Sequence, residues 1–210
     1  MPQTAQKFQM TTTHYQGLFA PPVVLPSRQE IFDFQVETLV AKKFATYTVA
    51  DPFRNRLAEL PNDRILLVPE PPKELDLTEL MSRVELNNKT GVNYIDRRYL
   101  KDEGEYPTTA SLLADVEDGA ARLNVKPMAS HENIAREKRH PYNTWRGIIH
   151  VAVFPWVLKH HYLDLVGTRC DGGRVPRLCV NDDEPALSRS WEDFALPYYG
   201  APSAGSVIVP

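Results

Sequence analysis

Apolar residues recur at three- and four-residue spacing in several stretches of the chain, most clearly at residues 143–154. Those that follow this spacing are Trp145, Ile148, Ile149, Ala152 and Val153. The period predicts a helix with one buried face. Asn143 or Thr144 is expected to cap its N-terminus. Pro155, which has no backbone N–H to donate, is expected to end it.

Two short β-prone runs follow, residues 162–168 and 175–180, with Asp-Gly-Gly-Arg between them. Glycine supplies the positive φ of a tight hairpin turn, so we expect a hairpin packed against the helix. With a two-glycine turn, position 170 pairs with position 175. Cys170 and Cys179 then lie about four rungs, or ~13 Å, apart. A disulfide needs Cα atoms within about 7 Å, so two free thiols are expected.

Helical patterns also occur in the first half of the chain. Ser27 with Glu30 forms a capping box for a helix that runs to about residue 43. A second helix is expected at 51–60, with Asp51 as its cap and Pro52 at its first position. A third begins at residue 77 and stops at the turn-forming residues 87–91.

Short apolar runs predict strands between these helices. The expected strands are 64–69, 92–95, 111–116, a returning partner at 120–125 and an edge strand at 185–191. Residues 101–107 read as a polar connector, and 131–139 as a short surface helix. Helices and strands mixed at irregular spacing predict a single α+β domain over residues 27–193, with a mixed or mainly antiparallel sheet.

Both ends of the chain lack a periodic pattern. Residues 1–26 are either a flexible tail or an extended arm, and the apolar run at 17–25 favours an arm lying on the body or on a neighbouring subunit. Residues 194–210 read as an apolar C-terminal tail that contains Pro and Gly.

Composition narrows the class of protein. The 210 residues carry a formal charge of −3 and two cysteines, which argues against a nucleic-acid partner and suits a reducing cytoplasm. The sequence shows no signal peptide and no apolar stretch near the ~18 residues that span a membrane. We therefore expect a cytoplasmic protein without a membrane partner.

Several stretches together resemble the uncharacterised actinobacterial family DUF5701. They are FDFQVETLV at 32–40, ILLVPE at 65–70, LLADVEDGAARLNVKP at 112–127, Phe154-Pro155, and LVGTRCDGGRVPRLCV at 165–180. The resemblance covers roughly residues 29–191. It implies the α+β fold and a bacterial, cytoplasmic origin, and it implies no activity.

Candidate chemistry is sparse. His150 and Cys170 are the catalytic candidates, since Cys170 next to Arg169 is expected to be an exposed thiol with a lowered pKa. Arg146, four residues before His150 on the helix, and Trp191 are the ligand-binding candidates. Solvated or hydrogen-bonded histidines and a plain strand-end cysteine are the simpler interpretation. The histidine and carboxylate spacings favour no metal site, and no cofactor motif occurs.

Two functional interpretations follow. The first is a binding or accessory protein that acts through self-association or a protein partner, which the apolar ends of the chain favour. The alternative is a small-molecule-binding protein or enzyme with a pocket near the 143–154 helix and the 165–180 hairpin.

Overall fold

The computed structural model of this protein describes residues 26–210, which form an α+β fold as the sequence predicts. The α-helices in this range are α2 (Arg28–Ala41), α3 (Asp51–Arg54), α4 (Leu77–Ser82), α5 (Pro127–Arg136) and α6 (Thr144–Val153). Short 3₁₀ helices lie at Tyr47–Ala50, Leu57–Glu59, Arg97–Tyr99, Ala120–Arg122 and Pro155–Lys159. Apart from Pro26, the predicted N-terminal arm lies outside the described residues.

The first sheet has four strands in the order β1–β6–β13–β7, and all its neighbouring pairs are antiparallel. Its strands are β1 (Ile65–Val68), β6 (Ser111–Glu117), β13 (Ser203–Ile208) and β7 (His140–Pro141). Strands β1 and β6 confirm two of the predicted strands. The returning strand predicted at 120–125 is wrong, because that segment holds a 3₁₀ helix and β6 pairs with β1 and β13 instead.

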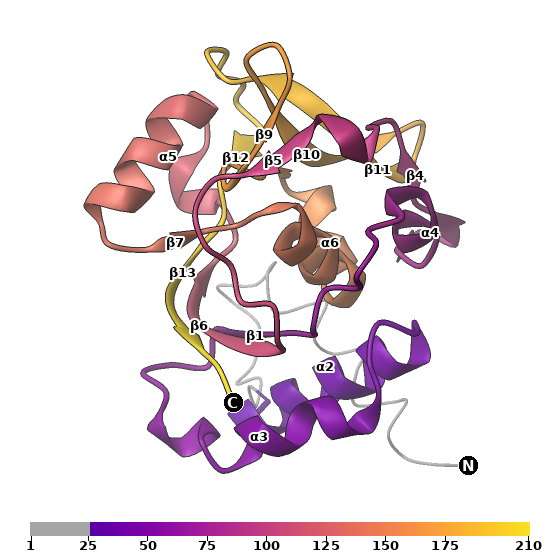
Figure 1. Ribbon diagram of the computed structural model, residues 1–210, viewed down its shortest axis with the longest axis vertical. Coiled ribbons are helices and arrows are strands. Elements are labelled where there is room, and N and C mark those ends of the chain that lie inside the picture. The colour runs from indigo at the N-terminus through magenta and orange to yellow at the C-terminus, as the bar shows by residue number, and fades with distance from the viewer. Residues whose placement is uncertain (1–25) are drawn as a thin grey trace, which may run out of the picture.

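Strand β13 comes from residues that the sequence predicts to be a tail. It lies inside the first sheet between β6 and β7 (Figure 1), with Ala204 opposite Val116 and Val207 opposite Leu113. The strand sequence is SAGSVI. Small residues fill its first half, so no alternation of large apolar and polar side chains marks it as a strand.

The second sheet has seven strands, with the path β12–β8–β10–β11–β4 and with β9 and β5 attached beside β10. Its strands are β4 (Val92–Asn93), β5 (Leu100–Asp102), β8 (Tyr162–Asp164), β9 (Thr168–Cys170), β10 (Arg174–Asn181), β11 (Glu184–Trp191) and β12 (Tyr199–Gly200). A separate two-stranded hairpin, β2 (Glu85–Leu86) with β3 (Lys89–Thr90), follows α4.

The predicted hairpin is confirmed, but its register is wrong. Cys170 pairs with Arg174 rather than with residue 175, so the turn holds three residues, and its two glycines have φ values of 75° and 69°. The first strand is also interrupted between β8 and β9, so Asp164 lies opposite Arg177. Strand β11 is not at the edge, because β4 pairs with it in parallel.

Helix α6 lies between the two sheets (Figure 1), in contact with β1, β10 and α2. Asn143 caps it as predicted, by accepting a hydrogen bond from the backbone N–H of Arg146 at 3.0 Å. The prediction of one buried face is wrong, since all ten of its residues are buried. Both polar candidates on this helix, Arg146 and His150, therefore lie inside the protein.

Helix α2 begins with the predicted capping box between Ser27 and Glu30. It packs on the edge strand β1, where the side-chain amide of the buried Gln35 donates to Ile65 O at 3.1 Å and accepts from Leu67 N at 2.7 Å. These two bonds satisfy backbone groups of β1 that have no neighbouring strand on that side.

The helix predicted at 51–60 is shorter than expected. Only α3 is α-helical there, and it lies between two 3₁₀ helices. Asp51 is the first helical residue and Ala50 occupies the cap position, so the expected cap is wrong by one residue. The turn after α4 is the β2–β3 hairpin, with Asn87 and Asn88 at φ values of 55° and 63°.

Candidate functional site

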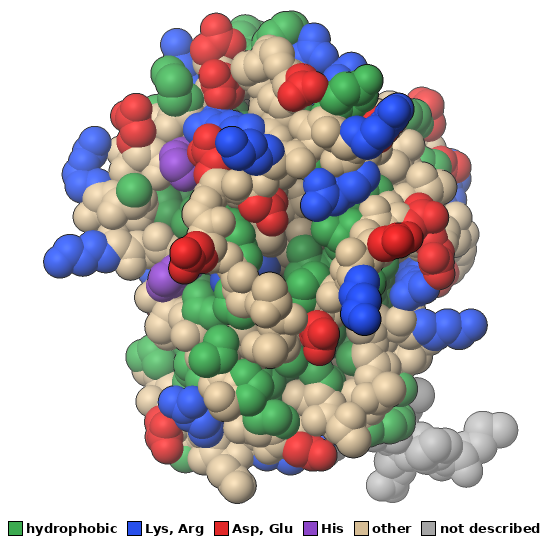
Figure 2. All heavy atoms as spheres, viewed as in Figure 1, with side chains coloured by type: hydrophobic (Ala, Val, Ile, Leu, Met, Phe, Trp, Pro, Cys, Tyr) green, Lys and Arg blue, Asp and Glu red, His purple; other side chains and the backbone are tan. Residues whose placement is uncertain are grey.

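A cleft of about 510 Å³ lies at the N-terminal end of α6, bounded by the chain that follows β1 and by the connector between β5 and β6. Figure 2 shows this face of the molecule hollowed near its centre, in front of α6. The polar and charged side chains that line it include Lys73, Glu74, Arg97, Asp102, Tyr106, Asn143 and Arg146. Volumes of this size accommodate small-molecule ligands.

Arg146 lines the cleft and is only 4% exposed. Its guanidinium carbon stands 4.7 Å from the centre of the Tyr106 ring, and Nη1 donates to Pro141 O at 3.3 Å. Among the described residues it forms no ion pair with a carboxylate. Burial lowers the pKa of Arg146, while Tyr106, Tyr142 and Asp102 act in the opposite direction. The site thus holds a buried cation without an anionic partner.

Tyr106 fixes the position of the Arg146 side chain. Its single hydroxyl hydrogen is shared between two acceptors, Gly167 O at 3.2 Å and Pro141 O at 3.4 Å. Gly167 has no room for a Cβ atom, which would meet the Tyr106 hydroxyl and would lie 2.7 Å from Tyr142 O. Burial raises the pKa of Tyr106 well above its usual value, so the ring is a neutral surface for the guanidinium to stack on.

Asp102, on β5, supplies a fixed negative charge in the cleft. Its Oδ1 accepts from Thr168 Oγ1 at 2.5 Å and its Oδ2 accepts from Asn143 Nδ2 at 3.0 Å. Thr168 Oγ1 also accepts from the backbone N–H of Thr144 at 3.0 Å. The carboxylate is therefore held at a fixed distance from the first turn of α6, although Asp102 itself is exposed.

The structure brings only one of the sequence candidates into this cleft, and that one is Arg146. His150 is one turn further along α6 and 4% exposed, against the rings of Tyr142 and Phe154 at 5.8 and 5.7 Å between centres. Its Nδ1 has no hydrogen-bond partner among the described residues. Burial lowers the pKa of His150 to about 4, with Asp118 acting in the opposite direction. His150 is therefore a neutral residue of the interior at physiological pH.

The expectation for Cys170 is wrong. The thiol is buried rather than exposed, and burial raises the pKa of Cys170 to about 11, although Arg189 and Arg174 oppose this rise. A protonated thiol is a poor nucleophile. Both cysteines are free, as predicted, and both are buried.

Trp191 lies at the end of β11 and does not line the cleft. It is 52% exposed, and the guanidinium carbon of Arg174 stands 4.1 Å from the centre of its ring. Arg174 is its register partner across the β10–β11 pair. Trp191 thus lies outside the cleft that Arg146 lines.

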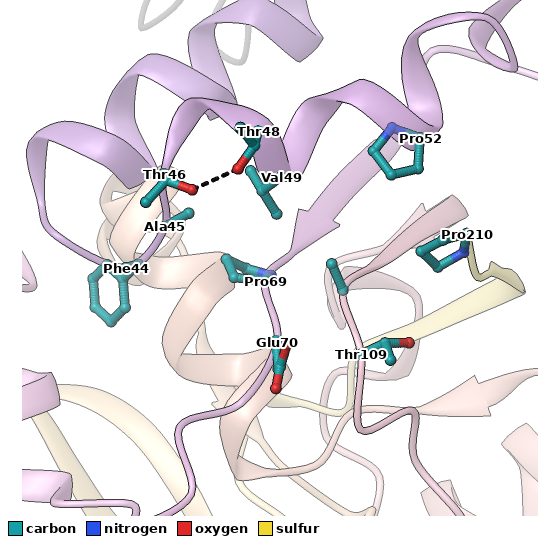
Figure 3. A pocket seen from close by; sticks show the side chains of 11 residues that line it. Phe44, Ala45, Thr46, Thr48, Val49, Pro52, Pro69, Glu70, Thr109 and Pro210 are labelled. Carbon is teal, nitrogen blue, oxygen red and sulfur yellow. Dashed lines mark hydrogen bonds between the residues drawn. The ribbon is translucent and has the colours of Figure 1, made fainter.

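A second hollow of about 350 Å³ lies between the segment after α2 and the ends of β1 and β13. Figure 3 shows its apolar walls, with the rings of Phe44, Pro52, Pro69 and Pro210 around it. Thr46 and Thr48 hydrogen-bond to each other at 2.8 Å. Glu70 is the one charged side chain among its lining residues. Unlike the cleft, it has no Lys or Arg among its lining residues.

Sequence reasoning missed Asp102 and Tyr106, which both lie in or beside the segment that it assigns to a polar connector. The only available signal was the tyrosine within a charged, turn-rich stretch. No group of three or more His, Cys, Asp or Glu residues suited to a metal ion occurs within residues 26–210. No helix in that part of the chain is long and apolar enough to cross a membrane.

A family model described as a family of unknown function, DUF5701, matches residues 29–207 and so covers nearly all of the described elements. No curated protein and no solved structure matches the chain.

Proposed function

We propose that this chain, which belongs to the DUF5701 family of unknown function, binds a small anionic molecule in the cleft at the N-terminal end of α6. The single observation that carries the proposal is the state of Arg146. Arg146 is only 4% exposed, and its guanidinium has no carboxylate partner within residues 26–210, so it loses hydration without regaining an ion pair. A bound anion would supply the missing partner through charge-assisted hydrogen bonds.

The rest of the cleft supports this proposal. Lys73 and Arg97 line it and are exposed. Arg97 donates to the carbonyl of Leu100 at 3.1 Å, and within the described part of the chain neither cation forms an ion pair with a carboxylate. Apolar side chains complete the walls, among them Pro71, Pro72, Leu75 and Pro107. A few polar groups in an apolar recess are typical of small-molecule sites.

We expect substitution of Arg146 by methionine to remove anion binding while leaving the free protein intact. The variant loses about 1.5–3 kcal/mol of charge-assisted hydrogen bonding to the ligand, so affinity should fall roughly tenfold to a hundredfold. The free variant should be as stable as the wild type or more stable, because a buried unpaired charge is replaced by an apolar side chain of similar length. Thermal unfolding and calorimetry with inorganic phosphate and with succinate, at constant ionic strength, measure both effects.

The matched control is Arg136→Met, which removes the same charge from the exposed surface of α5. It should bind both probes as the wild type does. Equal binding by wild type and R146M would contradict the proposal. The proposal would also be contradicted if R146M were several kcal/mol less stable than the wild type and bound both anions equally well. Arg146 would then act through packing alone.

A second candidate function is contact with another protein chain, and a specific observation favours it. Five large apolar side chains are exposed in two neighbouring segments, and we call this set the apolar surface patch: Leu123, Met128, Trp191, Phe194 and Tyr198. The two segments are joined by backbone hydrogen bonds from Asn124 N to Tyr199 O at 3.2 Å and from Met128 N to Glu192 O at 3.0 Å. Exposed apolar groups that gather in this way are typical of protein–protein interfaces.

A further inference from the structure

Two opposite charges line the same cleft without pairing to each other. Arg146 and Asp102 both face it, and Asp102 is close enough to raise the pKa of Arg146 against the larger effect of burial. The structure nevertheless describes no hydrogen bond or ion pair between them. Opposite charges that line one cleft attract each other, and here each of the two side chains is held by other partners instead.

Those contacts are present on both sides. The carboxylate of Asp102 is fixed by Thr168 and Asn143, one bond to each oxygen. The guanidinium of Arg146 is fixed by the face of the Tyr106 ring and by Pro141 O. The fold thus holds a cation and an anion apart from each other at the N-terminal end of α6.

Each of the two groups still has hydrogen-bonding capacity to spare. A carboxylate oxygen has about two acceptor positions, and Asp102 uses one on each oxygen. A guanidinium has five N–H donors, and Arg146 donates from Nη1 to Pro141 O, which leaves other donors for a ligand. A ligand between them could therefore accept from Arg146 and donate to Asp102 at the same time.

We propose that the ligand of this cleft is a small zwitterion of the α-amino-acid class, with its carboxylate on Arg146 and its ammonium group on Asp102. The inference rests on the proposed anion binding and specifies its ligand. A ligand that is only an anion would satisfy Arg146 but would bring a second negative charge towards Asp102. A ligand that is only a cation would leave Arg146 unpaired. The apolar walls formed by Pro71, Leu75 and Pro107 are left to contact the amino-acid side chain.

The first experiment uses the wild-type full-length chain and needs no variant. The twenty L-amino acids are tested singly by thermal unfolding, and those that stabilise the protein are measured by calorimetry. Each binder is compared with its α-hydroxy acid, which replaces the ammonium group by a hydroxyl, and with its amide, which removes the carboxylate charge. We expect at least one amino acid to bind, and both analogues to bind at least about tenfold more weakly, because each leaves one buried or fixed charge without its partner.

The second experiment assigns the two groups to the two residues. In Asp102→Asn, the affinity for the amino acid should exceed the affinity for its hydroxy acid by about threefold or less. The reason is that asparagine carries no charge to pair with the ammonium group. In Arg146→Met, the difference between the amino acid and its amide should disappear in the same way. The matched control is the exposed Asp193, which does not line the cleft, and Asp193→Asn should leave both differences unchanged.

The outcomes separate the two proposals. If phosphate or succinate binds through Arg146 and no amino acid does, or if the hydroxy acid binds as tightly as the amino acid, the zwitterion is ruled out and anion binding stands. If no probe shows binding that depends on Arg146, both proposals fail. Should D102N not fold, the comparison of the three ligand forms on the wild type still decides the question.

Discussion

At the scale of single residues, Asp164 on β8 is, like Arg146, a buried ionisable group whose pKa is shifted by burial. It is 2% exposed and accepts from Ser190 Oγ at 2.7 Å. Burial raises the pKa of Asp164 to about 6, although the Ser190 bond and Arg177 oppose this rise. Arg177 does not form an ion pair with it in the described structure, because its Nη1 donates instead to the Tyr199 hydroxyl at 2.6 Å.

Substitution of Asp164 by asparagine should stabilise the protein at alkaline pH. The folded-state pKa is raised above the unfolded value near 3.8, so the folded state binds the proton more tightly, and the stability that this provides is lost as the pH rises through about 6. At pH 8 the ionised, buried carboxylate then costs about 3 kcal/mol. We expect D164N to recover a large part of this in urea unfolding at pH 8, and to have little effect at pH 4.

Asp193→Asn is again the matched control, since Asp193 is exposed and its substitution should change neither measurement. An equal change at pH 4 and pH 8 would show that Asp164 acts through packing or hydrogen bonding rather than through its charge.

Residue patterns predicted the site only in part. Arg146 could be named because helical spacing places it on a predicted helix, and Asn143 because its side chain suits a cap. Asp102 and Tyr106 lie about forty residues earlier in a stretch without period, and the pairing of β5 with β9 in the second sheet places that stretch at the same cleft as Arg146. A contact of that kind depends on strand pairing, which local spacing does not encode.

At the scale of elements, the last strand of the chain completes the first sheet. Strand β13 pairs with β6 on one side and with β7 on the other. Arg139, just before β7, donates from Nε to the Ser203 hydroxyl at 2.8 Å and from Nη1 to Asp115 Oδ2 at 2.5 Å. Strand β13 therefore joins segments from the middle of the chain.

Removal of residues 203–210 should abolish cooperative folding. The deletion leaves β6 and β7 without their shared neighbour and exposes unpaired backbone groups inside the sheet. Because net stability is typically only about 5–15 kcal/mol, we expect no cooperative transition in thermal or urea unfolding followed by circular dichroism. The control removes only residues 209–210, which are exposed and follow β13, and it should unfold cooperatively. A cooperative transition in the longer deletion would mean that β13 is dispensable, as a tail would be.

At the scale of the whole molecule, two sheets enclose α6, and two features of the surface remain for function. One is the cleft in front of α6 (Figure 2) and the other is the apolar surface patch. The patch lies where the start of α5 meets the segment between β11 and β12, and it includes Trp191 and Phe194, which are 52% and 60% exposed. The two functional proposals thus rest on different residues and can be tested separately.

If the patch joins two copies of this chain, the wild type should be a dimer at micromolar concentration in native mass spectrometry. The double substitution Trp191→Ser with Phe194→Ser should give a monomer, because it removes two large exposed apolar side chains from the interface. Tyr47→Ser is the control, since Tyr47 is 64% exposed and lies in another part of the chain. A wild type that stays monomeric, or a double variant that stays dimeric, would contradict self-association through this patch.

The sequence by itself determined those features that depend on neighbouring residues. The capping box of α2, the cap and end of α6, the strands β1 and β6 and the glycine turn before β10 are all predicted correctly from local patterns. The caps, the helix end and the turn follow from backbone sterics or from a side chain that bonds the backbone a few residues away. The two strands follow from short apolar runs, which are also local patterns.

Only the tertiary structure decided which segments meet. It placed β13 between β6 and β7, buried α6 on all sides, and brought Asp102 and Tyr106 to Arg146. It also buried Cys170 and so reversed the expected direction of its pKa shift. Strand pairing and desolvation depend on partners that are distant in sequence. A local pattern therefore indicates that a residue can be buried or charged, and the assembled fold decides what surrounds it.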